Sequence, residues 1–176
     1  MTEVVSRVLL DLELRTPAGE PVSLGDHLTA SLTVVQFVRY FGCLPCQEWL
    51  VEVDRTATAE KLGAFAVGGS ADYQATWLRE ERGVRMPLLL DPEHRLRDHV
   101  DAVKPLGWRL ADPRGAAAYV RSLRHGFKPQ AITRDTVRSP GVVILDSDGE
   151  VRWSYIGNRI GDYPPINQVL DAASRL

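Results

Sequence analysis

Hydrophobic and polar positions along the chain follow the two different periods that distinguish strands from helices. Residues 32–38 and 64–69 are nearly continuous apolar runs, as expected of central strands buried on both faces. Residues 45–61 and 71–81 instead repeat apolar positions at helical spacing, with charged positions between them. This order predicts a strand, a helix, a second strand and a second helix.

A late hairpin is the clearest antiparallel signal in the chain. Residues 141–145 and 150–156 have strand character, and the intervening Asp146-Ser147-Asp148-Gly149 has the composition of a tight turn. Shorter elements complete the pattern: strands at 9–14 and 21–24, a strand or turn at 86–91, a helix at 93–102 and a last helix at 165–174.

The pattern weakens between residues 104 and 136, where Arg, Gly and Pro are frequent and one helix is expected at 113–124. We interpret this segment as an insertion before the late hairpin, and as a candidate lid. Residues 1–176 then form a single α/β domain. Its predicted architecture is a mixed central sheet with helices on both faces and an N-terminal β extension.

Composition and charge narrow the classes of function. The 176 residues are 44% hydrophobic and 25% charged, which is typical of a globular domain. A net charge of −2 and a pI near 6.1 give no basic surface for nucleic acid, and no apolar run is long enough to span a membrane. The first residues lack the basic start and apolar stretch of a signal peptide, so we expect a cytoplasmic protein without nucleic-acid or membrane partners.

The candidate chemistry is a dithiol formed by Cys43 and Cys46, which lies where a buried strand is followed by a helix. Positions i and i+3 of a first helical turn share a face, so the two sulfurs can close a disulfide. Free N–H groups at the helix start and the positive charge of Arg39 favour a thiolate, so we expect a cysteine pKa below the roughly 8.5 of a free thiol. Pro45 suits the first helical turn, because the N–H groups of that turn have no partner within the helix and the lack of one costs no hydrogen bond.

Two other interpretations of the cysteine pair are weaker. Zinc needs about four ligands, and His94 and His99 lie too far along the chain and on different faces of their predicted helix, so no metal site is expected. An inert buried pair or a structural disulfide is the second alternative. A redox dithiol fits better, because close cysteine pairs in a reducing compartment are typically redox-active. No nucleotide-binding motif is present, so we expect no flavin or nicotinamide cofactor.

Three aromatic side chains lie close to the dithiol in sequence. Trp49 is interpreted first as a core residue of the amphipathic helix and second as a wall of the site. Tyr40 and Phe41 precede the dithiol and are expected to form an exposed hydrophobic docking rim.

Residues 37–48, Phe-Val-Arg-Tyr-Phe-Gly-Cys-Leu-Pro-Cys-Gln-Glu, resemble the active-site segment of the AhpC/TSA superfamily, in particular its peroxiredoxin-like 2 branch. Segments 86–92, 139–151 and 161–165 resemble a strand, the late hairpin and the approach to the last helix of the same branch. The likeness covers most of the chain and is poorest in the insertion. It implies a thioredoxin-like fold with an N-terminal extension, and thiol-dependent redox activity.

The resemblance also carries expectations for single residues. Pro140 matches the cis-proline that faces the dithiol in thioredoxin-like proteins. It also occupies about the place of the late-strand arginine of true peroxiredoxins, for which Arg138 is a candidate substitute. Cys43 stands where those proteins have Thr or Ser, and Arg39 stands where their active-site loop begins with proline. These departures favour dithiol–disulfide exchange over efficient peroxide activation.

We therefore expect a thiol-disulfide oxidoreductase or thiol peroxidase that cycles through a Cys43–Cys46 disulfide while reducing a disulfide, a peroxide or a related small oxidant. Cys43, nearer the loop, is expected to be the more accessible nucleophile, whereas alignment with peroxiredoxins assigns that role to Cys46. A thioredoxin-type protein or a low-molecular-weight thiol would supply electrons, and a homodimer is compatible with this interpretation. The alternative is a redox-sensing or partner-binding module without turnover.

Overall fold

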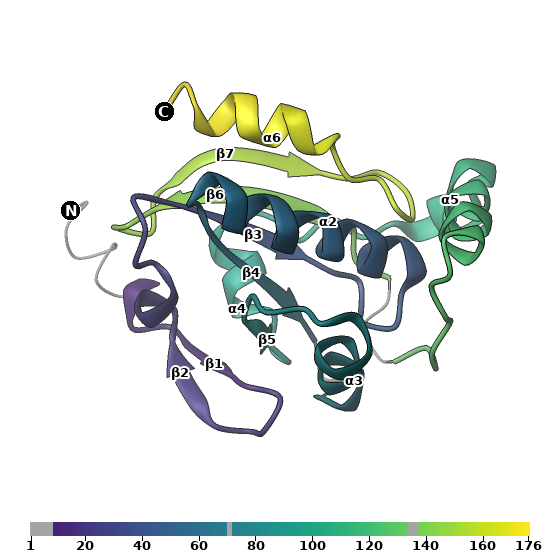
Figure 1. Cartoon of the computed structure of the whole chain (residues 1–176), viewed down its shortest axis with the longest axis horizontal. Coiled ribbons are helices and arrows are strands. Elements are labelled where there is room, and N and C mark those ends of the chain that lie inside the picture. The colour runs from purple at the N-terminus through teal and green to yellow at the C-terminus, as the bar shows by residue number, and fades with distance from the viewer. Residues whose placement is uncertain (1–8, 70–71, 134–136) are drawn as a thin grey trace.

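The computed structural model describes residues 9–69, 72–133 and 137–176. A seven-stranded sheet with the order β2-β1-β5-β4-β3-β6-β7 runs through the molecule (Figure 1). Its strands are β1 (Glu13–Arg15), β2 (Pro21–Ser23), β3 (Leu32–Phe37), β4 (Gly63–Gly68), β5 (Leu88–Leu90), β6 (Gly141–Asp146) and β7 (Val151–Ile156). The central strand β3 is parallel to β4 and antiparallel to β6, which confirms the predicted mixed sheet.

Helices cover both faces of the sheet, also as predicted. They are α2 (Leu44–Glu60), α3 (Asp72–Arg82), α4 (Arg95–His99), α5 (Pro113–Arg124) and α6 (Ile166–Ala173), with short 3-10 helices at Leu24–His27 and Gly107–Ala111. Within the described residues, no helix combines the length and apolar character that a membrane span requires.

The alternation of side chains along β3 explains why its sequence is apolar except for Thr33 and Gln36, both of which are buried. Val34 belongs to one core cluster, together with Leu50 of α2, Leu78 of α3 and Val169 of α6. Its neighbour Val35 belongs to a second cluster on the opposite face, which contains residues of the N-terminal segment and of α4. Because both faces of this strand are buried, polar residues do not alternate with apolar ones along it.

Two predicted elements are shorter than expected. The strand expected at 9–14 begins only at Glu13, because Leu9 and Leu10 form a helical turn closed by a hydrogen bond from the Leu12 N–H to the Leu9 carbonyl. The helix expected at 93–102 is the single turn Arg95–His99, and Asp101 beyond it has a left-handed φ of 58°. A non-glycine residue in that region ends the regular helix.

The insertion expected at 104–136 contains the predicted helix, α5, with the predicted bounds. Its base is closed by two backbone hydrogen bonds, from Leu106 to Val137 and from Ser139 to Lys104. α5 then lies beside the N-terminal end of α2, far from the N-terminal hairpin of the sheet (Figure 1). This end of α2 carries the dithiol, so the insertion is positioned by the fold to cover it.

Candidate active site

The dithiol lies at the start of α2. Cys43 is the N-cap residue with an extended backbone, Pro45 lies in the first turn, and the Gln47 N–H bonds to the Cys43 carbonyl over 2.9 Å. Both cysteines are free thiols. Their side chains share one end of the helix as the i, i+3 spacing predicts.

Both sulfurs are shielded from solvent, which the sequence did not indicate. Cys43 and Cys46 each have an exposed fraction of 0%. The expectation that Cys43 is the more accessible of the two is therefore wrong. Neither sulfur reaches solvent, because α5 and the segment before α6 pack over the start of the helix. Solvent access cannot assign the two roles, so electrostatics and hydrogen bonding must.

Arg39 lies where the sequence placed it, beside the dithiol. Its guanidinium is largely buried, donates to the Cys43 sulfur at 4.0 Å and lies 5.8 Å from the centre of the Tyr40 ring. Its backbone N–H additionally contributes a hydrogen bond to the Cys46 sulfur. One residue thus contacts both sulfurs.

The predicted docking rim is wrong. Tyr40 and Phe41 are exposed by only 5% and 1%. The Tyr40 hydroxyl lies 3.1 Å from the hydroxyl of Tyr119 on α5, and the ring of Phe41 packs so closely on Gly68 that a Cβ there would lie 2.5 Å from it. α5 of the insertion covers Tyr40 and β4 packs on Phe41, so both side chains are enclosed beside the dithiol.

Tyr163 is a site residue that our sequence analysis missed. Its hydroxyl lies 3.1 Å from the Phe37 carbonyl and within hydrogen-bond reach of the Cys46 sulfur, so its single proton is shared between these two acceptors. Burial and the neighbouring Cys46 raise the pKa of Tyr163 well above its usual value, so the hydroxyl keeps its proton. The signal was present in the 161–165 segment, whose resemblance to the family marked the approach to the last helix.

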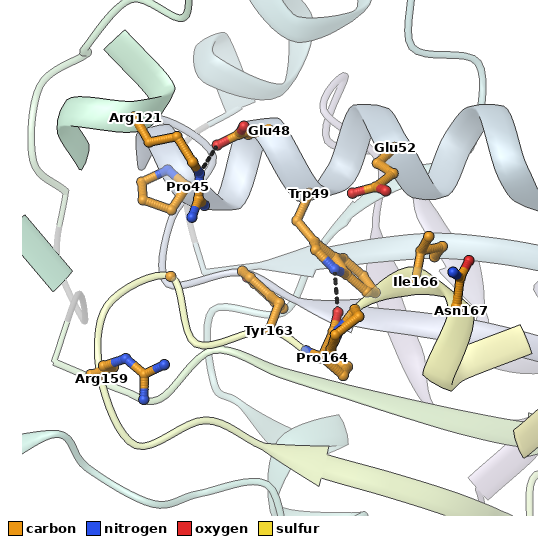
Figure 2. Close-up of a pocket in the computed structure, with 12 residues that line it drawn as sticks. Pro45, Glu48, Trp49, Glu52, Arg121, Arg159, Tyr163, Pro164, Ile166 and Asn167 are labelled. Carbon is orange, nitrogen blue, oxygen red and sulfur yellow. Dashed lines mark hydrogen bonds and ion pairs between the residues drawn. The ribbon is translucent and has the colours of Figure 1, made fainter. Parts of the chain in front are cut away.

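Trp49 has both of the roles considered for it. It is a buried core residue, and its ring stacks on Tyr163 with 4.9 Å between centroids and 13° between planes. Its indole N–H donates to the Pro164 carbonyl at 2.9 Å (Figure 2). Trp49 therefore holds Tyr163 in the position from which it reaches Cys46.

The two thiols differ strongly in acidity. Burial raises the pKa of Cys46, but hydrogen bonds from Cys43, from Tyr163 and from the Arg39 backbone outweigh it and lower the pKa to about 7. Burial raises the pKa of Cys43 well above its ordinary value, and the hydrogen bond that it donates to Cys46 raises it further. Near neutral pH Cys46 is accordingly partly ionised, whereas Cys43 keeps its proton.

The structure bears on two expectations near β6, the cis-proline at Pro140 and the role of Arg138 beside the dithiol. The Ser139–Pro140 bond is trans, so the predicted cis-proline is wrong. The segment before β6 pairs with the base of the insertion through a bridge between Pro105 and Arg138, which holds it extended. No hydrogen bond or ion pair joins Arg138 to either cysteine in the described part of the chain.

A polar cluster connects α5 to α2 next to the dithiol. The Glu48 carboxylate accepts from Ser122 Oγ at 2.6 Å, contacts His125 Nδ1 at 2.5 Å and forms an ion pair with Arg121 at 3.4 Å. Burial raises the pKa of Glu48, but these hydrogen bonds and the arginine charge lower it below its usual value. The carboxylate is therefore ionised at neutral pH and holds the insertion against α2.

A groove of about 530 Å³ borders the dithiol on the side of α5 and the segment before α6 (Figure 2). Pro45 and Tyr163 form the part of its wall nearest the cysteines. The remaining lining residues are Glu48, Trp49, Glu52, Arg121, Arg159, Gly161, Pro164, Pro165, Ile166 and Asn167. A small molecule in this groove is separated from Cys46 by the side chain of Tyr163.

Comparisons with known proteins agree with this geometry. The sequence model of the AhpC/TSA family matches residues 5–154. A plant relative, the chloroplastic thioredoxin-like protein AAED1 of Arabidopsis thaliana, is 24% identical over 173 residues, which cover 92% of this chain and 68% of the relative.

Solved structures share the fold at low sequence identity. Peroxiredoxin Q of Xanthomonas campestris superposes with a TM-score of 0.62 at 14% identity, covering 96% of this chain and 94% of the other. The peroxidoxin BcpB of Mycobacterium tuberculosis gives a TM-score of 0.64 at 14% identity, with coverage of 94% and 92%. The family match spans most of the chain and includes the dithiol, so this protein belongs to the AhpC/TSA family and is a thiol-dependent oxidoreductase of the peroxidase or disulfide-exchange type.

Proposed function

We propose that this protein is a thiol peroxidase in which Cys46 attacks the oxidant and Cys43 resolves the intermediate. The observation that carries the assignment is the set of hydrogen bonds on Cys46. Its sulfur is contacted by the Cys43 thiol, the Tyr163 hydroxyl and the Arg39 backbone, whereas burial keeps Cys43 protonated. A thiol whose pKa lies near the ambient pH combines a large thiolate fraction with high nucleophilicity.

The cycle follows from these two protonation states. The Cys46 thiolate attacks one peroxide oxygen, the O–O bond breaks, and an alcohol or water leaves as Cys46 becomes a sulfenic acid. The Cys43 thiol then attacks that sulfur, expels water and closes the disulfide. Two external thiols restore the dithiol, and they leave joined as one disulfide.

Burial favours a small oxidant over a protein disulfide. With both sulfurs at 0% exposure, a bulky disulfide requires α5 to leave α2, whereas a small peroxide requires only local movement beside Tyr163. The groove of about 530 Å³ is an entry route of suitable size for such a molecule.

The same burial favours a second candidate, a redox-sensing or partner-binding module. In that case the dithiol oxidises once, and the disulfide alters the packing of α5 without further turnover. Excess peroxide and reductant separate the two functions, since an enzyme consumes many equivalents of peroxide per chain and a sensor consumes about one.

The proposal also includes a reductant and a compartment. A thioredoxin-type protein or a low-molecular-weight thiol reduces the Cys43–Cys46 disulfide. We assign the cycle to the cytoplasm, where thiol pools are kept reduced. A homodimer is compatible with it, and sedimentation of the reduced protein tests that state.

The assignment is tested by titrating the ultraviolet thiolate absorbance in the wild type and in Cys43→Ser and Cys46→Ser. We expect the wild-type thiolate to form near pH 7, as the Cys46 pKa of about 7 requires, and to be lost in Cys46→Ser. Peroxide treatment of Cys43→Ser should leave a sulfenic acid on Cys46 that dimedone traps. A low-pH thiolate that survives in Cys46→Ser would instead make Cys43 the nucleophile.

A further inference from the structure

Arg97 is a buried cation at the dithiol end of the sheet. Its side chain is only 3% exposed, and it comes from α4, on the face of the sheet opposite α2. The guanidinium donates to the carbonyl of Val38 at 2.8 Å, of Ser139 at 2.9 Å and of Ala102 at 3.2 Å. It also lies 5.0 Å from the centre of the Phe37 ring. The hydrogen-bond acceptors of this guanidinium are therefore neutral carbonyl groups.

No ion pair neutralises this charge within the described residues. The buried carboxylate nearest in the chain is that of Asp91, whose charge acts on Arg97 at a distance while its oxygens accept from the backbone N–H groups of Arg95 and Leu96 at the start of α4. Carbonyl oxygens satisfy the donors of a guanidinium but leave its net charge in place. Buried charges in proteins are usually paired, because an unpaired one interacts strongly over distance in a low dielectric.

The carbonyls that Arg97 binds lead directly to the site. Val38 precedes Arg39, and Ser139 precedes Pro140, where the family resemblance places a catalytic arginine. The neighbouring Phe37 carbonyl accepts from Tyr163, whose hydroxyl also bonds to Cys46. Arg97 thus fixes the strand end from which Arg39 and Tyr163 are held.

We propose that Arg97 is a positioning residue for the reaction, and that it adds from α4 a second buried positive charge that holds Cys46 as a thiolate. The inference rests on the proposed role of Cys46. Arg39, the other cation of the site, donates its guanidinium to Cys43, and Cys46 receives its backbone N–H together with the electrostatic effect of its charge. Arg97 acts together with Arg39 but from the opposite face of the sheet. It substitutes for the late-strand arginine of true peroxiredoxins, whose place is occupied here by Pro140.

The charge of Arg97 persists at the pH where Cys46 titrates. Burial lowers the pKa of Arg97 to about 10, although Tyr163 and Cys46 counteract part of that effect, so the guanidinium stays protonated at neutral pH. The other titratable or charged groups near Cys46 are Cys43 and Arg39 at the start of α2, Tyr40, Tyr119 of α5 and Tyr163 before α6. Arg138 and Asp91 lie on the far side, around Arg97.

The test compares Arg97→Gln with Arg97→Lys by titration of the thiolate absorbance. Both variants lose hydrogen bonds and should melt at lower temperature, but only Arg97→Gln loses the charge. We expect Arg97→Gln to raise the Cys46 pKa by about 1 unit, a roughly tenfold loss of thiolate below the pKa, with a matching loss in peroxide reactivity. Arg97→Lys should titrate near the wild type, as should Arg95→Gln, which removes an exposed arginine from the same helix.

Two results would overturn this inference alone. If wild-type Cys46 titrates near pH 7 and Arg97→Gln leaves that value unchanged, Arg97 is only structural while the proposed function stands. If Arg97→Gln does not fold, Arg97→Met decides, because it also removes the charge and fills the buried space with an unbranched side chain. A Cys46 pKa that is higher in Arg97→Met than in Arg97→Lys supports the proposal, and equal values in the two variants contradict it. A wild-type thiolate on Cys43 would instead overturn the proposed function itself.

Discussion

Single hydrogen bonds distinguish the two cysteines, which have the same burial and lie on the same helical turn. Cys46 receives the Cys43 thiol proton as well as other donors. Cys43 also receives donors, from Arg39 and the Cys46 backbone, but burial and the bond that it donates to Cys46 outweigh them, so the pair shares its negative charge unequally. Tyr163 is the partner whose contribution can be removed most cleanly. Its ring is held by Trp49 regardless of the hydroxyl.

Replacing Tyr163 by Phe should raise the Cys46 pKa by about 1 unit, because a hydrogen bond to a charged group contributes about 1.5–3 kcal/mol and part of it is replaced by other donors. Thiolate absorbance measures the shift. Tyr155→Phe is the matched control, since it removes a hydroxyl that bonds to Asp162 in the same region without facing a sulfur. Equal titration curves for Tyr163→Phe and the control would exclude a role for Tyr163.

At the scale of elements, the position of α5 on α2 decides whether the dithiol is enclosed. The polar part of this contact depends on one carboxylate, Glu48. It binds Arg121 and Ser122 of α5 and His125, the residue that follows the last turn of α5. Because its pKa is lowered in the folded protein, its contribution to stability is complete above the unfolded value. That contribution is lost only as the pH falls through the folded pKa, well below neutrality.

Glu48→Gln should therefore loosen α5 at neutral pH without unfolding the domain. Loss of about 1–2 kcal/mol at this contact predicts about 5- to 30-fold faster modification of the cysteines by a bulky thiol reagent. Glu52→Gln is the control, one turn further along the same groove and without an ion pair to the described residues. Rates that match between the two variants would show that α5 does not limit access.

At the scale of the whole molecule, three segments distant in sequence meet above the dithiol. Gly161 adopts a left-handed φ of 71°, and a Cβ there would lie 2.8 Å from the Cβ of Pro45 and 3.0 Å from that of Ala118. The start of α2, the insertion and the approach to α6 thus touch at a position that has no room for a side chain.

Gly161→Ala should destabilise the protein more than a left-handed backbone alone explains. The backbone strain costs about 1 kcal/mol, and the clash adds about 1–3 kcal/mol. Urea unfolding measures both against Gly19→Ala, where φ is 85° but no atom lies within 4 Å of the added Cβ. Equal losses for the two variants would mean that the three segments are loosely packed.

Most of the scaffold was predictable because its signals are local. The continuous apolar runs gave β3 and β4, the turn composition gave the hairpin of β6 and β7, and helical spacing gave α2 close to its observed bounds. The short helix α4 was overestimated, because the left-handed residues His94 and Asp101 that flank it have no strong sequence signal.

The sequence by itself determined that Cys43 and Cys46 share the first turn of a helix after a buried strand, since spacing and periodicity are properties of neighbouring residues. Tertiary structure alone decided which sulfur becomes the thiolate and how deeply both are buried. Tyr163 lies 126 positions from its partner Phe37, and Arg97 lies 59 positions from Val38. Contacts of this length depend on how the whole sheet and its helices pack, and no local pattern records them.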